Sequence, residues 1–116
     1  MIERKRGHIL AVSSLSAKVS TYYMVAYTTT KSGNAGFMQS LHEDLCLKNQ
    51  DEFIKLTTVY PAYVSTQKDL QDLIGTACDI PFYDPDYIAE LIVSGMLINR
   101  REFIVPPASG IFQFFK

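Results

Sequence analysis

A tyrosine and a lysine stand four residues apart, at Tyr27 and Lys31, in a stretch whose pattern predicts a helix. Side chains at this spacing project from the same face of a helix and can share one site. A tyrosine ordinarily titrates at about 10, so a phenol that exchanges protons near neutral pH needs an adjacent positive charge that favours the phenolate. A lysine at this spacing could supply that charge, although the spacing by itself proves little about function.

The position of this pair in the predicted fold is better evidence for a functional site than its spacing. Chance alone would produce roughly 0.4 tyrosine–lysine pairs at this spacing in a chain of this composition. Ser14 ends a short apolar run at 8–13, and Pro-Ala-Tyr-Val-Ser-Thr at 61–66 follows a second run at 53–60. The carboxyl ends of parallel strands meet at one edge of a sheet, where open α/β sheets bind their ligands. The three segments are therefore expected to converge at this edge. The alternative is that Tyr27 and Lys31 simply lie on a solvated face of the helix.

The two runs predict strands and the residues between them a helix. The first is nearly all apolar, which is typical of a strand buried on both faces, and the second is rich in β-branched and aromatic residues. A helix is predicted from Val25 to about Lys48, and strand, helix, strand implies a right-handed parallel crossover. Small and apolar residues at three- or four-residue steps predict its buried face: Ala26, Thr30, Gly33, Phe37, Leu41 and Leu45.

The remainder of the chain predicts a loop at 62–83 with about one helical turn, and then a second helix and a third strand. Asp84 and Pro85 have the types of an N-cap and a first helical residue. Arg-Glu-Phe-Ile-Val at 101–105 predicts the strand. The buried face of the second helix is predicted to hold Tyr87, Ile88, Leu91, Ile92 and Gly95. This order predicts one α/β domain with a parallel sheet.

Two glycines interrupt the first predicted helix, at Gly33 and Gly36. Each costs about 1 kcal/mol relative to alanine inside a helix. We therefore expect them to be compensated by close packing against a neighbouring backbone.

Composition narrows the classes of partner. A formal net charge of -1 provides no overall field to attract nucleic acid or an anionic membrane surface. Cys46 and Cys78 lack CxxC spacing, which indicates a reduced, intracellular protein. His8 and His42 lack metal-ligand spacing to other residues, so no metal site is expected. We expect neither a secretory signal nor a membrane-spanning run.

The chain resembles the short-chain dehydrogenase/reductase family in the order and spacing of its motifs. The motifs are Gly-His-Ile-Leu-Ala-Val-Ser-Ser-Leu-Ser-Ala at 7–17, Tyr-Thr-Thr-Thr-Lys at 27–31, Gly-Phe-Met-Gln-Ser-Leu at 36–41 and Pro-Ala-Tyr-Val-Ser-Thr at 61–66. Three further stretches resemble the membrane-associated branch that includes retinol and 17-beta-hydroxysteroid dehydrogenases. They are Ile-Lys-Leu-Thr-Thr-Val-Tyr-Pro at 54–61, Asp-Pro-Asp-Tyr-Ile-Ala-Glu at 84–90 and Asn-Arg-Arg-Glu-Phe-Ile-Val-Pro at 99–106.

The resemblance implies a fold and a departure from it. Residues 1–116 would form a single partial domain, the C-terminal half of a Rossmann-type doubly wound parallel sheet with three strands and two main helices. The N-terminal dinucleotide-binding half would be absent, because the six glycines form no GxxxGxG turn ahead of a helix. The isolated chain is therefore expected to be inactive.

The resemblance also implies the roles of particular residues. Ser14, Tyr27 and Lys31 would be catalytic, and Ser13 remains the alternative to Ser14, because strand alternation turns the two serines opposite ways. Tyr27 and Lys31 would also contact NAD or NADP, together with Pro61, Val64 and Thr66. The reaction would be hydride transfer between a cofactor and a lipophilic alcohol or its ketone or aldehyde, of retinoid or steroid type.

Partners and location follow from the same resemblance. A homodimer would form through the helix that carries Tyr27, and the protein would sit at the cytosolic face of the endoplasmic reticulum or of lipid droplets as a peripheral membrane protein. The alternative is a non-catalytic truncated remnant that acts through protein or membrane association. An unrelated α/β protein with a chance tyrosine and lysine is the third interpretation.

Overall fold

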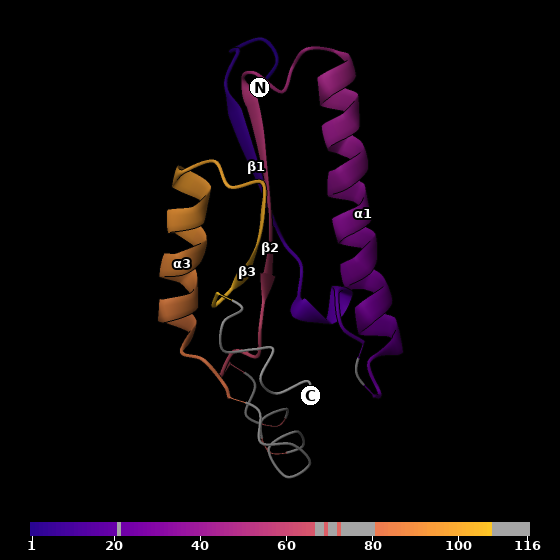
Figure 1. Ribbon diagram of the computed structural model, residues 1–116, viewed down its shortest axis with the longest axis vertical. Helices are drawn as coiled ribbons and strands as arrows, with labels where there is room; N and C mark the ends of the chain where they lie inside the picture. The colour runs from indigo at the N-terminus through magenta and orange to yellow at the C-terminus, as the bar shows by residue number, and fades with distance from the viewer. Residues whose placement is uncertain (21, 67–68, 70–71, 73–80, 108–116) are drawn as a thin grey trace.

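The computed structural model describes residues 1–20, 22–66, 69, 72 and 81–107 and shows a three-layer α/β arrangement (Figure 1). Three parallel strands pair in the order β1-β2-β3, with one long helix on each face of the sheet. The elements are β1 (Gly7–Val12), the 3-10 helix η1 (Leu15–Ala17), α1 (Val25–Leu47), β2 (Ile54–Pro61), α3 (Pro85–Leu97) and β3 (Glu102–Val105). The predicted α/β class with three parallel strands and two main helices is confirmed.

The central strand β2 supplies most of the core. It pairs in parallel with β1 from Ile54 to Val59 and with β3 from Thr58 to Pro61. Its side chains alternate between the two faces of the sheet. Ile54 and Leu56 pack with Met38 and Leu45 of α1, and Val59 packs with Ile88 of α3 and Val105 of β3. Both faces of the strand are therefore covered, as its β-branched sequence requires.

The element boundaries agree with the sequence pattern to within a residue or two. Asp84 is the N-cap of α3, and its carboxylate accepts hydrogen bonds from the backbone N–H groups of Asp86 and Tyr87 at 2.9 and 3.2 Å. Pro85 occupies the first helical position, where its missing N–H has no cost. Most of the predicted loop, residues 67–68, 70–71 and 73–80, lies outside the described residues.

The buried face predicted for α1 is wrong over the first half of the helix. Ala26, Thr30, Gly33 and Phe37 are exposed. Leu41 is partly buried and Leu45 is buried, as predicted, and Met38, which was not in the predicted set, is buried with them against the sheet. A helical period groups residues on one face, and it cannot tell how far along the helix that face stays in contact with the sheet. Phe37 is 65% exposed, so the first half of the predicted face meets solvent.

The glycines of α1 do not have the predicted close packing. Within the part of the chain that the structure describes, a Cβ atom added at Gly33 or Gly36 would meet nothing within 4 Å. Gly95 of α3 has this role instead, because a Cβ there would collide with the ring of Phe103. Tyr87 was also predicted to be buried, but it is 46% exposed.

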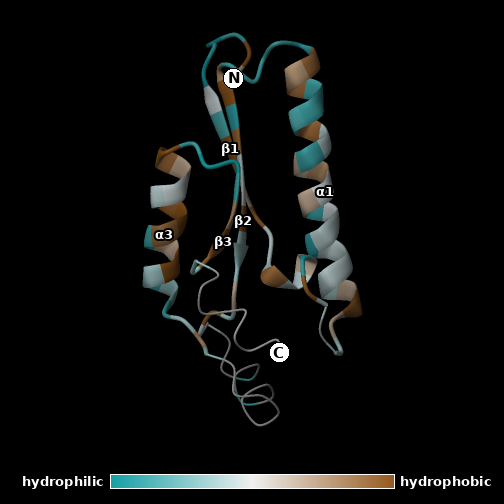
Figure 2. Cartoon of the chain, in the orientation of Figure 1, coloured by the Kyte–Doolittle hydropathy of each residue, from teal (hydrophilic) through white to brown (hydrophobic). Residues whose placement is uncertain are grey.

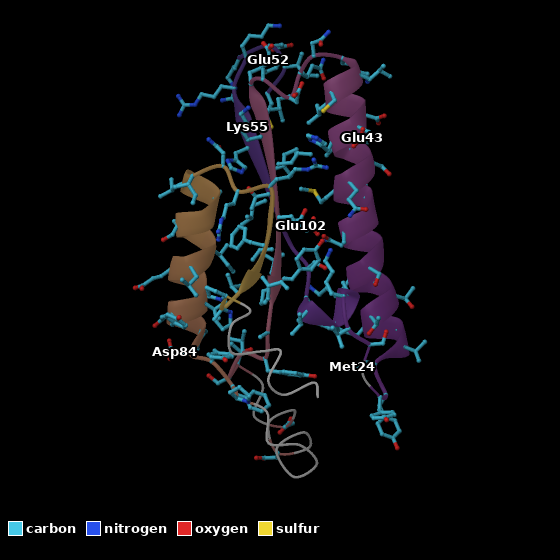
Figure 3. All side chains as sticks on the ribbon, viewed as in Figure 1. Met24, Glu43, Glu52, Lys55, Asp84 and Glu102 are labelled. Atoms are coloured by element: carbon cyan, nitrogen blue, oxygen red, sulfur yellow. The ribbon has the colours of Figure 1, made fainter. Side chains whose placement is uncertain are left out.

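The two helices begin at the end of the molecule where the strands end. Met24 and Asp84, which precede α1 and α3, both lie at this end (Figure 3). The segments that follow β1 and β2 therefore lie at the same end of the molecule as the first turn of α1 (Figure 1). Among the described residues, no helix is long and apolar enough to cross a bilayer.

Candidate active site

A cavity of about 370 Å³ lies at the carboxyl edge of the sheet. Its walls come from the end of β1 with η1, from the first turns of α1, and from the segment that follows β2. The lining includes all six site residues that the sequence predicts, namely Ser14, Tyr27, Lys31, Pro61, Val64 and Thr66. The structure thus brings them to one place, while their chemical roles stay predictions.

Ser14 is held by the turn that follows β1. Its backbone is extended and it is the N-cap of η1. The side-chain oxygen accepts hydrogen bonds from the backbone N–H of Ser16 at 3.2 Å and from the Ser16 hydroxyl at 3.0 Å. Since both bonds use the oxygen as acceptor, the Ser14 hydroxyl proton can be donated to an oxygen in the cavity.

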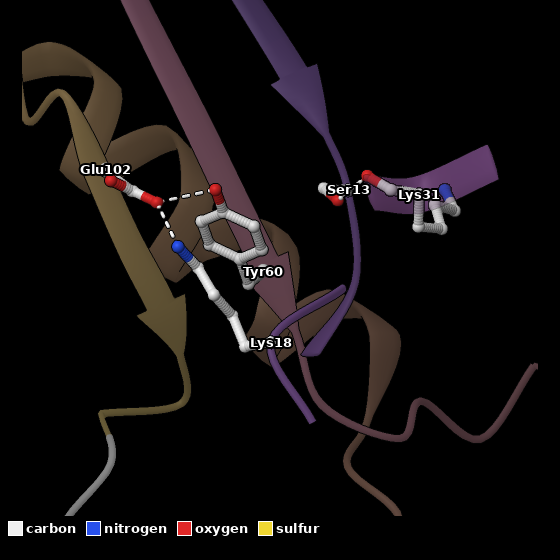
Figure 4. Close-up of polar contacts among 5 residues, drawn as sticks. All are labelled: Ser13, Lys18, Lys31, Tyr60 and Glu102. Carbon is white, nitrogen blue, oxygen red and sulfur yellow. Dashed lines mark hydrogen bonds and ion pairs between the residues drawn. The ribbon is translucent and has the colours of Figure 1, made fainter. Parts of the chain in front are cut away.

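Ser13 makes a different bond from its neighbour. It is 2% exposed, and its hydroxyl donates to the backbone carbonyl of Lys31 at 2.8 Å. Its backbone N–H donates to the Val59 carbonyl at 2.8 Å. The single hydroxyl proton of Ser13 is thus used to fasten α1 to the end of β1 (Figure 4).

Lys31 and Tyr27 lie on the same face of α1. The Lys31 ammonium donates to the backbone carbonyl of Val12 at 3.1 Å and lies 5.6 Å from the centroid of the Tyr27 ring. Together with the Ser13 bond, this gives two crossed hydrogen bonds between the end of β1 and one turn of α1. Tyr27 itself is 45% exposed, so its phenol remains accessible from the cavity.

The segment after β2 presents backbone groups to the cavity. Val64 forms a parallel bridge with Tyr83, in which the Ser65 N–H donates to the Tyr83 carbonyl and the Tyr83 N–H donates to the Tyr63 carbonyl, both at 2.9 Å. In a parallel bridge these bonds flank the central residue and leave its own N–H and C=O directed away from the partner. Among the described residues, neither backbone group of Val64 has a partner in these turn and loop bonds, so both are candidates to bind a planar amide.

A second polar group beside the cavity was not found from the sequence. Lys18, Tyr60 and Glu102 meet within hydrogen-bond distance on the face of the sheet that α1 covers. Lys18 and Glu102 are 84 residues apart in the chain. No spacing rule connects residues so far apart, and they meet only because β1 and β3 both pair with β2.

The one described cysteine does not have the properties of a nucleophile. Burial, with the nearby carboxylates of Asp51 and Glu43, raises the pKa of the Cys46 thiol. Its sulfur lies 3.3 Å from Nε2 of His42, one turn earlier on α1. A thiol with a raised pKa stays protonated and unreactive.

The family model for short chain dehydrogenases matches residues 1–72, which include Ser14, Tyr27, Lys31 and the whole segment from Pro61 to Thr66. The chain belongs to this family. The resemblance of the sequence motifs is thereby confirmed.

Known relatives agree with this membership. Dehydrogenase/reductase SDR family protein 7-like from Drosophila melanogaster is 30% identical over 99% of this chain and 36% of its own length. Human 17-beta-hydroxysteroid dehydrogenase 13 is 26% identical over 97% of this chain and 36% of its own length. The chain thus spans about a third of these relatives, one of which belongs to the branch that the sequence resembles.

A solved structure shows the same fold. The crystal structure of F189W actinorhodin polyketide ketoreductase with NADPH superposes with a TM-score of 0.71 over 95% of this chain and 49% of the ketoreductase chain. Sequence identity is 18%, so this likeness concerns the fold alone. It confirms the partial Rossmann-type sheet expected from the sequence.

Proposed function

We propose that this chain supplies the catalytic half of an NAD- or NADP-dependent oxidoreductase. The reaction is the interconversion of a lipophilic alcohol and its ketone or aldehyde, of retinoid or steroid type. One observation carries the proposal: a hydroxyl, a phenol and an ammonium, from Ser14, Tyr27 and Lys31, line one cavity at the carboxyl edge of the sheet. Family membership and the name of the human relative support the same chemistry.

Each of the three side chains has a different role in binding the substrate oxygen and transferring its proton. The Ser14 hydroxyl donates to the substrate oxygen and fixes its position. The Tyr27 phenol gives its proton to that oxygen during reduction and takes it back during oxidation. The Lys31 ammonium, 5.6 Å from the Tyr27 ring centroid, stabilises the negative charge that this transfer leaves on the phenol oxygen.

The donors around the cavity fit the nicotinamide end of a dinucleotide. Lys31 and Tyr27 present an ammonium and a hydroxyl to ribose hydroxyls, and Thr66 presents a hydroxyl to the carboxamide or the pyrophosphate. The chain near Pro61 and the backbone groups of Val64, which the bridge to Tyr83 directs away from Tyr83, suit the carboxamide. When bound, the nicotinamide gives or accepts the hydride.

Several other lining residues are apolar, which favours a lipophilic substrate. Val12, Leu15, Val19 and Met24 contribute hydrocarbon surface to the cavity. Burying apolar surface stabilises a bound ligand by about 25 cal/mol per Å². A ring system of steroid or retinoid size would gain most from such a wall.

Dinucleotide titration tests how much of the function this chain holds. The chain alone is expected to bind NADH and NADPH no more tightly than millimolar, because no Gly-rich turn supplies backbone donors and a helix N-terminus to the pyrophosphate. Joining it to the N-terminal part of the Drosophila relative should restore micromolar binding, measured by nicotinamide fluorescence. We call this protein the joined enzyme.

The joined enzyme also separates the proposal from its alternative. Turnover of a steroid or retinoid alcohol with NAD or NADP supports a catalytic role for this chain. Tight dinucleotide binding without any turnover would instead favour the non-catalytic remnant, acting through protein or membrane association.

We also infer that the chain forms a homodimer through α1. The exposed stripe of this helix includes Phe37, which is 65% exposed, and the small residues Gly33 and Ala26 on the same face; Val25, in the first turn, is 82% exposed. The first turn of α1 is apolar although it faces solvent (Figure 2). Small residues allow two such helices to approach closely, and burying the apolar side chains stabilises the contact.

Replacing Phe37 by glutamate should turn a dimer into a monomer, because two carboxylates would be buried in one contact. Size-exclusion chromatography with light scattering at micromolar concentration measures the change. The matched control is Tyr87→Glu on α3, where the side chain is 46% exposed. A dimer that persists in Phe37→Glu would show that association uses another surface.

We also propose that the protein attaches peripherally to the cytosolic face of the endoplasmic reticulum or of lipid droplets. Tyr22 and Tyr23, before α1, are 92% and 103% exposed. Tyrosine side chains favour the interface between lipid and water. Co-sedimentation with neutral lipid vesicles would measure this attachment.

A further inference from the structure

A carboxylate beside the cavity joins three elements through a single oxygen atom. Lys18 Nζ lies 2.6 Å from Glu102 Oε1, and the Tyr60 hydroxyl donates to the same oxygen at 2.6 Å (Figure 4). The Lys18 ammonium also lies 4.4 Å from the centroid of the Tyr60 ring. The residues come from the turn after η1, from β3 and from β2, and we call them the Glu102 cluster.

The charges of the Glu102 cluster are fixed by its own contacts. The hydrogen bond from Lys18, followed by the one from Tyr60, lowers the pKa of the Glu102 carboxyl. Burial, followed by the hydrogen bond to Glu102, raises the pKa of the Tyr60 phenol, which is 1% exposed. At neutral pH the cluster is therefore an ammonium, a carboxylate and a neutral phenol that donates its proton.

The cluster closes the turn that carries Ser14. Ser14 is the N-cap of η1 and Lys18 is its C-cap, with the Lys18 N–H donating to the Leu15 carbonyl at 2.9 Å. The start of this turn is fastened by Ser13, through its bonds to Lys31 and Val59. Its end is fastened to the sheet by the side chain of Lys18.

The same cluster reaches the other wall of the cavity. Tyr60 immediately precedes Pro61, which lines the cavity. Among the described residues that line the cavity, none belongs to the cluster itself. Lys18, Tyr60 and Glu102 can therefore act on the site only by holding the segments that do line it.

We propose that Lys18, Tyr60 and Glu102 are positioning residues that hold the Ser14 turn in place above the cavity. The inference rests on the proposed function, in which the Ser14 hydroxyl orients the substrate oxygen. Loss of the ion pair would free the end of the turn while Ser13 still fastens its start. The turn would then open locally without unfolding the sheet.

Amide hydrogen exchange in the 116-residue chain measures this opening. The reporters are the N–H groups of Ala17, Lys18 and Val19, which bond to carbonyls of Ser14 and Leu15 at 2.9 to 3.0 Å. Glu102→Gln should lower their protection about threefold to tenfold, in the range of a partly exposed ion pair with one additional hydrogen bond. The Gly7 N–H, bonded to the Phe53 carbonyl at the far end of the sheet, should stay within twofold.

Substitutions of Lys18 break the same ion pair without changing Glu102, so they test the loosening of the turn independently. Lys18→Met should loosen the same three amides, and Lys18→Arg should restore their protection, because arginine keeps the charge and the donors. Lys55→Met is the matched control, since Lys55 donates to the Asp51 carbonyl far from the turn. Unchanged protection in both Glu102→Gln and Lys18→Met overturns the inference.

The pH dependence of amide protection in the turn provides a second test. Because the pKa of Glu102 is lowered in the folded chain, its stabilisation is present above the ordinary carboxyl value of 4.5 and is lost as the pH falls through the lowered one. Lys18, Tyr60, Arg101 and, across the small cavity beneath α1, His42 surround this carboxylate. Protection of the turn should show an acid step that is missing from Glu102→Gln, in which those four neighbours are unchanged.

Kinetics in the joined enzyme distinguish positioning from mere stability. Glu102→Gln should lower kcat about threefold to tenfold with an unchanged Kd for the dinucleotide, and Lys18→Arg should keep the original kcat. A loosened turn with unchanged kcat overturns the positioning role. If the unmodified joined enzyme has no turnover, the proposed function fails, whereas the exchange data still decide whether the cluster holds the turn.

Discussion

Replacing Tyr27 by phenylalanine in the joined enzyme is expected to lower kcat about 10²- to 10⁴-fold, the usual contribution of a positioned acid or base. The phenol oxygen is the atom that exchanges a proton with the substrate oxygen, and phenylalanine keeps the ring while removing that atom. The Kd for the dinucleotide should change much less than kcat, because Lys31, Thr66 and the backbone near Val64 remain. Steady-state kinetics with fluorescence titration measures both quantities.

The matched control for this variant is Tyr63→Phe. Tyr63 lines the same cavity and packs against Phe82 with ring centroids 5.7 Å apart, so its ring contact survives the loss of the hydroxyl. Its kcat should stay within about threefold of the original. Equal turnover by Tyr27→Phe and the unmodified enzyme would remove Tyr27 from the mechanism.

Replacing Gly95 by alanine should destabilise the fold although alanine is the better helix former. A Cβ at this position would lie 2.7 Å from Cε1 and Cε2 of Phe103, and closer still to Cζ. Overpacking costs about 1–3 kcal/mol, and the gain in helix propensity offsets about 1 kcal/mol of that. We expect a net loss of up to about 2 kcal/mol in the free energy of unfolding, measured by urea denaturation.

Gly36→Ala provides the control of opposite sign. The described chain offers no atom within 4 Å of a Cβ at Gly36, so only the gain in helix propensity should remain, at most about 1 kcal/mol. Gly95→Ala combined with Phe103→Leu should recover part of the loss, since leucine leaves room for the new methyl group. A Gly95→Ala chain about 1 kcal/mol more stable than the original would show that the Phe103 ring moves aside without cost.

Much of the site could be predicted from the sequence, because the relevant rules are local or follow from parallel strands. Ser14 follows a buried strand, Tyr27 and Lys31 are four residues apart on a helix, and Pro61 ends the next strand. The carboxyl ends of parallel strands share one edge, so these residues had to meet near the cavity that they line. Their order and spacing also identified the family.

The choice between two similar side chains needed the structure. Ser13 and Ser14 have the same chemistry in adjacent positions, and the strand pattern only turns them opposite ways. The contacts show that the Ser13 proton is used on the Lys31 carbonyl, whereas the Ser14 hydroxyl acts as an acceptor in the turn and keeps its proton for the cavity. These hydrogen bonds distinguish the two side chains, while the catalytic role of Ser14 stays a prediction.

The sequence by itself determined the types and order of the elements and the grouping of the site residues, since these depend on hydrophobic period, capping and strand direction. Tertiary structure alone decided how far along α1 the predicted face is buried and that Lys18 meets Glu102 across 84 residues. A helical period specifies that residues share a face but not what the face contacts. Contacts between distant residues exist only after β1 and β3 have paired with β2 and both helices have packed on the sheet.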